Sequence, residues 1–289
     1  MIRSSLPHLH VAARSHPGMI GKNNEDRYSV SAFQLGRDDP RPSVFAVIAD
    51  GIGGHRAGEV AAELAVNYIS KGIAESNGKK PLNILENSIH EASQVIASHS
   101  AGKDDEEGMG STCACVWVIE NKLYTAYVGD SRIYFIRENH IQQLTIDHTW
   151  VQEAFEKGII TAEQMRDHPN VHVIRRHLGG LKLPEVDFRL RIDNEEGSQE
   201  SEQNQGFHLE PGDTLLICSD GLTDLVWDDE ILQIVRSKHD LKYAVDKLVN
   251  LANERGGHDN ITVVLLSMPR LEEMAKKTPG IIHWLLGEE

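Results

Sequence analysis

Aspartates that stand beside glycine or asparagine recur along the chain, and such carboxylates can hold divalent cations. Asp50-Gly51 ends a short apolar run, Ser219-Asp220-Gly221 ends another, and Asp259-Asn260 precedes a third. Carboxylate oxygens are hard ligands that suit Mg²⁺ or Mn²⁺, and a glycine lets the backbone carbonyl approach an ion closely. A single Asp-Gly is more often a turn than a ligand, because this dipeptide is common in turns. Only a set of such segments that converge in the fold predicts a metal site.

Two further segments have the same layout. Asn24-Glu25-Asp26 precedes the strand-like residues 28–32, and Gly129-Asp130-Ser131-Arg132 follows the apolar residues 123–128. All of these carboxylates lie at the ends of expected strands. Strand ends can meet at one edge of a β sandwich even when they are far apart in sequence. We therefore expect one site that draws on distant segments.

The elements that must position these side chains are recognisable from hydrophobic periodicity. Helical spacing of apolar residues begins at Ala57, and five later stretches also favour helices. The strands cluster around helical pairs and do not alternate with helices one by one, which favours an α+β fold with antiparallel sheets. We expect strands at 44–49, 111–119, 123–128, 133–136, 141–144, 215–218 and 260–267, and helices from 57, at 82–96, at 149–157, after 161, at 228–235 and at 241–252.

Two segments stand apart from this pattern. Residues 193–206 are polar and acidic and lack large apolar side chains, so we expect a disordered surface loop. Residues 269–289 follow the last strand and form a tail beyond a domain of residues 1–268. The tail ends in the apolar stretch 281–286, which either packs back on the domain or docks on a partner.

The bulk composition excludes several classes of protein. The formal net charge of −15 disfavours binding to nucleic acids. The negative charge either keeps the protein soluble or concentrates cations, and the net charge alone does not decide between these two interpretations. No apolar run reaches the roughly 20 residues of a membrane span. The chain has three cysteines, Cys113, Cys115 and Cys218. An odd number of cysteines without the spacing of a disulfide framework indicates a reducing compartment, by default the cytoplasm.

The ordered series of motifs resembles that of the metal-dependent protein serine/threonine phosphatases of type 2C, the PPM family, in its bacterial form. Order and approximate spacing both fit over residues 11–267, and the segment Asp50-Gly51-Ile52-Gly53-Gly54-His55 is the most diagnostic. The series is Asn24-Glu25-Asp26, Asp50–His55 with Gly58-Glu59, Gly110-Ser111-Thr112, Gly129–Arg132, Ser219–Leu222 and Asp259–Thr262.

The resemblance implies a four-layer α-β-β-α sandwich, two antiparallel sheets flanked by helices, with a flap over about 138–180. It implies two tightly bound Mn²⁺ or Mg²⁺ ions and a third, weaker ion. Asp50 would bridge the two ions, the Gly51 carbonyl would bind one, and Asp220 and Asp259 would complete the coordination of the second ion. Glu25 and Asp26 would act through water, and Asp130 would help hold the third ion.

The chain departs from the family pattern at two positions. Some members carry a histidine directly after Asp-Gly, where this chain has Ile52; His55 is then a candidate general acid, although packing or helix entry explains it as well. The arginine that holds the substrate phosphate is replaced by Gly21. The neighbouring Lys22 is a candidate replacement, and an ordinary solvated lysine is the alternative.

The implied activity is hydrolysis of phosphoserine and phosphothreonine in proteins by water activated at the binuclear centre. It would oppose a bacterial Ser/Thr kinase, and the partners would be that kinase or its targets. None of the cysteines is followed by an arginine six positions later, so the loop of a cysteine-nucleophile phosphatase is absent. Two alternatives remain. One is a catalytically weak phosphoprotein-binding module on the same fold, and the other is a phosphatase of a dedicated regulator phosphoprotein or of small phosphoesters.

Overall fold

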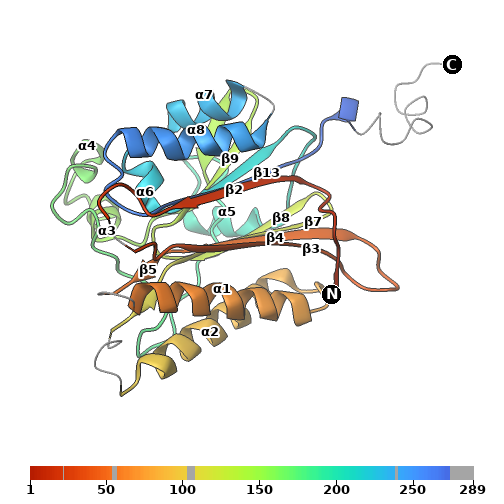
Figure 1. Cartoon of the computed structure of the whole chain (residues 1–289), viewed down its shortest axis with the longest axis horizontal. Helices are drawn as coiled ribbons and strands as arrows, with labels where there is room; N and C mark the ends of the chain where they lie inside the picture. Colours follow the sequence, from red (N-terminus) through yellow and green to blue (C-terminus); the bar gives the residue numbers. More distant parts are fainter. Residues whose placement is uncertain (22, 54–56, 103–107, 238–239, 274–289) are drawn as a thin grey trace.

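The computed structural model describes residues 1–21, 23–53, 57–102, 108–237 and 240–273. Two antiparallel sheets pack face to face, and helices cover the outer face of each (Figure 1). The α+β sandwich expected from the sequence is therefore confirmed. None of the described helices combines the length and the apolar character needed to cross a membrane.

The first sheet has six strands in the order β1-β3-β4-β7-β8-β11. Helices α1 (Ala57–Glu75) and α2 (Pro81–Ser100) pack against each other on its outer side. The strands are β1 (Ile2–Arg3), β3 (Arg27–Gln34), β4 (Pro42–Ala49), β7 (Cys113–Ile119), β8 (Lys122–Val128) and β11 (Phe207–His208).

The second sheet has five strands in the order β10-β9-β12-β13-β2. Helices α7 (Asp228–Ser237) and α8 (Leu241–Glu254) cover it, and the Asp240 side chain caps α8 by accepting from the N–H groups of Lys242 and Tyr243. The strands are β2 (His10–His16), β9 (Arg132–Arg137), β10 (His140–Gln143), β12 (Thr214–Cys218) and β13 (Ile261–Ser267).

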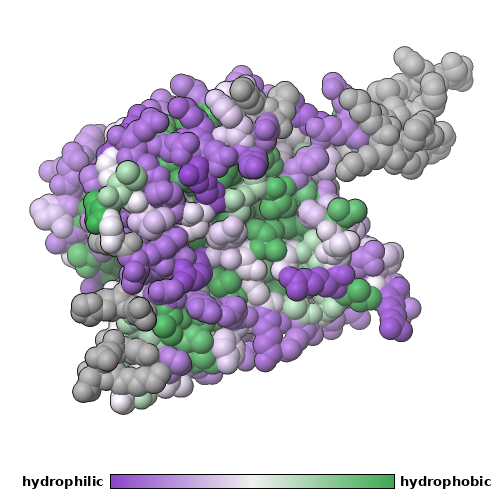
Figure 2. Space-filling model, in the orientation of Figure 1, coloured by the Kyte–Doolittle hydropathy of each residue, from purple (hydrophilic) through white to green (hydrophobic). Residues whose placement is uncertain are grey.

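The strand alternation divides the core into three apolar layers. In β4, Phe45 and Val47 point toward α1 and α2, whereas Val44 and Ile48 point into the space between the sheets. A third layer lies between β13 and α8. Figure 2 shows apolar surface where the two sheets meet on the visible face, which is the side of β2 and β3. This packing holds the strand ends in fixed relation to one another.

Short elements complete the fold, most of them at the end of the sandwich that carries the aspartates or in the long connections. The segment 138–180 contains β10, α3 and α4, and Thr149 caps α3 as its side chain accepts from the Gln152 N–H. The elements are β5 (Gly51–Ile52), β6 (Gly110–Ser111), α3 (Trp150–Glu156), α4 (Ala162–Met165), α5 (Ser198–Gln203) and α6 (Asp220–Thr223).

The expectation of a disordered loop at 193–206 is wrong. Residues 198–203 form α5, and Ser201 is buried. Gln205 replaces a missing strand partner of β8: its Oε1 accepts from the Thr125 N–H at 2.9 Å, and its Nε2 donates to the Thr125 carbonyl at 2.9 Å. Polar side chains therefore order this segment by hydrogen bonding to a sheet edge, although it has little apolar surface to bury.

This contact predicts a stability effect. Gln205→Ala leaves the buried Thr125 backbone without its side-chain partner, and it should lower the free energy of unfolding by about 1–3 kcal/mol. Gln203→Ala, on the exposed face of α5, is the matched control and should change it by less than about 0.5 kcal/mol. Urea denaturation measures both. Equal effects of the two substitutions would contradict the role assigned to Gln205.

Candidate active site

Five aspartates from separate segments gather at one end of the sandwich, near β5 and α6 in Figure 1. Asp26 precedes β3, Asp50 lies between β4 and β5, Asp130 lies between β8 and β9, Asp220 opens α6, and Asp259 comes just before β13. Both sheets contribute, because strands of each end at this edge. The structure thus brings together the five aspartates that the sequence singled out.

The mutual repulsion of these carboxylates shows how close they are. Burial raises the pKa of Asp50 well above its ordinary value, and the charges of Asp26, Asp220, Asp130 and Asp259 raise it further. The pKa of Asp220 is raised in the same way, first by burial and then by neighbouring aspartates. A cluster of this kind is unfavourable without counter-charges.

Asp26 and Asp130 are the most deeply buried members. Burial raises the pKa of Asp26 to about 6, although hydrogen bonds from Thr262 and Ser219 act in the opposite direction. Burial and the nearby Asp147 raise the pKa of Asp130 to about 7. Both carboxyls therefore titrate near neutral pH in the protein without bound cations.

The cluster has the donor set of a divalent-cation site. Within the described part of the chain, Oδ1 of Asp26, Oδ1 of Asp130 and Oδ1 of Asp220 are buried without a hydrogen-bond partner. Buried polar oxygens normally have a hydrogen-bond partner, so three neighbouring oxygens without one require an explanation. Divalent cations with oxygen ligands supply both the missing partners and the missing positive charge. The residues present fit Mg²⁺ or Mn²⁺.

Glu25 and Gly51 lie against the start of α1. A side chain at position 51 would collide with the carbonyl of Gly58, so only glycine permits this approach of two backbones. The Glu25 carboxylate lies beside Gly58, and the Glu25 N–H donates to Asn260 Oδ1 at 2.7 Å. Glu25 and Gly51 thus adjoin the aspartate cluster, and their roles as ligands stay a prediction.

Hydroxyl and amide side chains fix the loops that carry the aspartates. Ser219 Oγ donates to Asp26 Oδ2 at 2.7 Å and accepts from the Thr262 N–H at 3.0 Å. The Asp50 N–H donates to Thr112 Oγ1 at 3.0 Å, and that hydroxyl bonds Ser131 Oγ at 2.8 Å. These residues belong to the motif series, but sequence reasoning assigned them no role. Their function becomes visible only once the segments meet.

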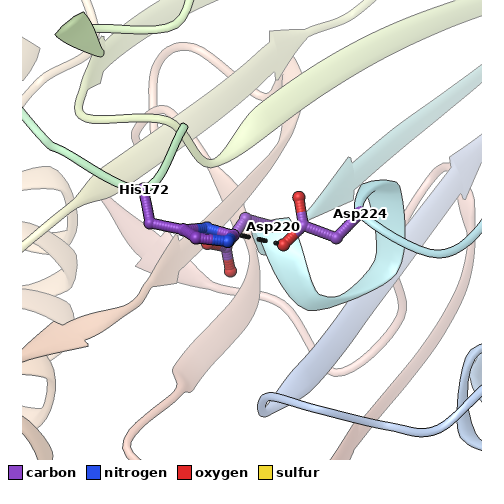
Figure 3. A group of neighbouring side chains, drawn as sticks. All are labelled: His172, Asp220 and Asp224. Carbon is purple, nitrogen blue, oxygen red and sulfur yellow. Dashed lines mark ion pairs between the residues drawn. The ribbon is translucent and has the colours of Figure 1, made fainter. Parts of the chain in front are cut away.

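A sixth aspartate and a histidine extend the cluster (Figure 3). Asp224 lies one helical turn beyond Asp220, and His172 Nδ1 lies 3.7 Å from Asp224 Oδ2. One ligand atom from each of His172, Asp220 and Asp224 falls within 4.8 Å of the others. Sequence reasoning missed both added residues. The i, i+4 spacing of Asp220 and Asp224 was the available signal for the aspartate, whereas His172 has none.

A cleft of about 620 Å³ opens above these aspartates and is lined on its other side by α4 and the following loop. Arg132 and Arg166 line it, and both guanidinium groups are engaged. Arg132 Nη2 pairs with Asp147 Oδ2 at 2.7 Å, and Arg166 Nη2 donates to the Asp224 carbonyl at 2.7 Å. Either arginine would have to give up these contacts in order to bind a substrate phosphate in place of the arginine that the family pattern has.

Of the three positions that the sequence links to catalysis or to binding of the substrate phosphate, the structure describes only Gly21. His55 and Lys22 lie outside the described residues, so their roles stay predictions. Gly21 is exposed, has φ +76°, and has nothing within 4 Å of the position where a Cβ would stand. An arginine at position 21 would have space but would adopt an unfavourable backbone conformation.

Known proteins resemble this chain in sequence and in fold. Residues 20–158 match the family described as protein phosphatase 2C. The serine/threonine phosphatase Stp of Listeria monocytogenes is 34% identical over 262 residues, covering 89% of this chain and 95% of that protein. The solved structure of Stp1 from Staphylococcus aureus is 28% identical with a TM-score of 0.77, covering 92% of this chain and 97% of that one.

A further solved structure bears directly on the aspartate cluster. The catalytic domain of the serine/threonine protein phosphatase PstP, in complex with two manganese ions, is 31% identical with a TM-score of 0.72. The match covers 90% of this chain and 97% of that domain. On the identity and coverage of these relatives, together with the order of its motifs, the chain belongs to the protein phosphatase 2C family.

Proposed function

We propose that this protein hydrolyses phosphoserine and phosphothreonine in proteins at a centre of two Mn²⁺ or Mg²⁺ ions. The observation that carries the proposal is the gathering of five aspartates with three unpartnered buried oxygens at one end of the sandwich. The manganese ions in the related PstP domain support the identity of the cations.

Each residue of the centre has a distinct task in this proposal. Asp50 would be shared by both ions, the Gly51 carbonyl would bind one of them, and Asp220 and Asp259 would complete the coordination of the second ion. Glu25 and Asp26 would act through water, and Asp130 would help hold a third, weaker ion. Ions held by these residues would lower the pKa of water toward neutrality and would offset charge on the phosphoryl oxygens.

The cysteines of the described chain are unsuited to act as nucleophiles. Cys113, Cys115 and Cys218 are all buried. Burial raises the pKa of the Cys115 and Cys218 thiols, so the reactive thiolate is disfavoured. This supports direct attack by water on phosphorus, with the seryl or threonyl oxygen as the leaving group and without a covalent phosphoenzyme.

The partners follow from the reaction. A phosphoprotein phosphatase needs a kinase that supplies its substrate, so we propose a Ser/Thr kinase or its targets as partners, in the cytoplasm. The free cysteines favour such a reducing compartment. Residues 274–289 lie outside the described residues, and docking of this tail on a partner stays a prediction.

Hydrolysis of a phosphothreonine peptide tests the proposal. Phosphate release should require Mn²⁺ or Mg²⁺ and stop with excess EDTA, and a phosphotyrosine peptide should be a much poorer substrate. Absence of hydrolysis at saturating Mn²⁺ would favour the binding-module alternative. Faster turnover of para-nitrophenyl phosphate than of every phosphoprotein tried would favour the small-phosphoester alternative.

Gly21→Arg tests how the substrate phosphate is held. An arginine offers two parallel hydrogen bonds to phosphate, whereas the present chain has none at this position. The substitution should lower the KM for a phosphopeptide by about tenfold with little change in kcat. Gly21→Ala is the control, because it imposes the same backbone strain without the charge. Lys22→Ala should raise the KM. If neither Gly21→Arg nor Lys22→Ala shifts the KM, other residues hold the phosphate.

A further inference from the structure

A buried histidine stands directly behind the turn that carries Asp130. The side chain of His148 is 4% exposed. The Gly129 N–H donates to His148 Nδ1 at 3.0 Å, and the His148 N–H donates to the Gly129 carbonyl at 3.0 Å. Both backbone groups of the residue before Asp130 are therefore held by this one histidine.

The turn at Gly129 sets the direction of the Asp130 carboxylate. Gly129 has φ +110°, and a Cβ there would lie 2.6 Å from Thr112 Cβ, so the backbone conformation is specific to glycine. Asp130 Oδ1 is buried and has no hydrogen-bond partner in the described chain. With that oxygen unpartnered, the carboxylate direction depends strongly on how the preceding backbone is fixed.

His148 is itself fixed in orientation and in tautomer. Because the Gly129 N–H points at Nδ1, that nitrogen carries the lone pair and the ring proton resides on Nε2. Nε2 then donates to Asp187 Oδ2 at 3.1 Å. The ring also stacks on Tyr127, with centroids 5.3 Å apart and planes 16° from parallel. The ring is thus held at both nitrogens and on one face.

Asp187 is a stable acceptor for this proton. Burial opposes its ionisation, but hydrogen bonds from His148 and Arg189 outweigh burial and lower the pKa of Asp187. Arg189 Nε donates to both carboxylate oxygens, at 3.0 and 2.9 Å. A continuous chain of contacts therefore runs from Arg189 through Asp187 and His148 to the Asp130 turn.

We propose that His148, backed by Asp187, is a positioning residue that aims the Asp130 carboxylate and so sets the affinity for the divalent ion held there. This inference rests on the proposed function, in which the ion near Asp130 is the most weakly bound of the three. His148 acts through Gly129 and Asp130, and it has no direct contact with the reacting atoms.

His148→Phe tests the proposal, because phenylalanine keeps the stack on Tyr127 and removes both ring nitrogens. Mn²⁺ binding is followed by electron paramagnetic resonance of the free ion. The Kd of the weakest bound Mn²⁺ should rise about three- to tenfold, as expected for the loss of one hydrogen bond, and the tighter ions should be unaffected. The Mn²⁺ concentration for half-maximal phosphopeptide hydrolysis should rise by the same factor, with kcat regained at saturation. Asp130→Ala should abolish that binding step.

Two variants separate positioning from general loss of structure. His148→Asn places an amide oxygen close to where Nδ1 stands, so it should restore most of the Mn²⁺ affinity. His168→Phe is the matched control. His168 also stacks on an aromatic ring, Trp150 at 4.8 Å, and also accepts a backbone N–H, from Asn170 at 3.1 Å. Within the described residues His168 makes no hydrogen bond to the Asp130 turn, and its substitution should leave Mn²⁺ binding unchanged.

Several outcomes would overturn the proposal. One is wild-type Mn²⁺ binding in a folded His148→Phe protein, and another is equal weakening of all ions. If His148→Phe fails to fold, Asp187→Asn decides, since it should weaken the same ion by about threefold, and unchanged binding would reject the role. If the wild type hydrolyses no phosphopeptide while His148→Phe still loses only its weakest ion, the proposed function fails and the positioning role stands.

Discussion

The Asp50→Asn variant should lose phosphopeptide hydrolysis by about a hundred- to a thousandfold while its metal-free form becomes more stable than the wild type. Both effects come from one change of charge. The amide is a poor bridging ligand, and it adds no negative charge to attract divalent ions. In the absence of ions it also removes the carboxylate that Asp26, Asp220, Asp130 and Asp259 repel.

The sign of the stability effect follows from the raised pKa of Asp50. A carboxyl whose pKa is higher in the folded than in the unfolded protein destabilises the fold at pH values above both. Replacing it with an uncharged group of similar shape removes this penalty. Asp38→Asn, at an exposed position outside the cluster, is the control and should alter neither quantity.

Thermal unfolding in EDTA and initial rates in Mn²⁺ measure the two effects. Near wild-type turnover of Asp50→Asn would reject the metal centre. Lost turnover together with a much lower unfolding midpoint would mean that Asp50 serves the fold more than the reaction.

The central aspartates were predictable because each lies in a short motif at a strand end. Asp50 and Asp220 both precede glycine after an apolar run, so sequence periodicity places them at the sheet edge. The order of the motifs then indicates that they share a site. No contact across the sandwich was needed for that inference, because each motif is local in sequence and the order of the motifs resembles that of the family.

Two residues that sequence reasoning missed, Asp187 and Gln205, depend on long-range contacts. Asp187 meets His148 across 39 positions, and nothing in its neighbourhood in the sequence marks it. Gln205 meets Thr125 across 80 positions and orders a segment that looks disordered by composition. Composition measures how much apolar surface a segment can bury. It does not reveal that one side-chain amide forms hydrogen bonds with the backbone of an edge strand.

The metal-free protein should become less stable as the pH rises from about 4 to 8. The folded-state pKa values of Asp26, about 6, and Asp130, about 7, lie above the ordinary 3.8. Over this range the folded protein therefore binds more protons than the unfolded chain, and stability falls with rising pH. The shift of Asp26 alone corresponds to about 3 kcal/mol. Asp187 has the opposite effect on stability, because its pKa is lower in the folded protein than in the unfolded chain. Its ionised form therefore stabilises the fold, and this contribution is lost only when the pH falls below the ordinary pKa of an aspartate.

Mn²⁺ should reverse this dependence, because ions compete with protons for the same carboxylates. At a hundred times its Kd, each ion adds about 2.7 kcal/mol to the free energy of unfolding, so two ions should raise the unfolding midpoint by on the order of 10 °C or more. The rise should be larger at pH 8 than at pH 5, where protonated Asp26 and Asp130 bind ions poorly. Circular dichroism melts at both pH values, with EDTA or Mn²⁺, measure it, and Asp50→Asn should flatten the response. A midpoint in EDTA that climbs from pH 5 to pH 8 would mean that the aspartates do not share one buried site.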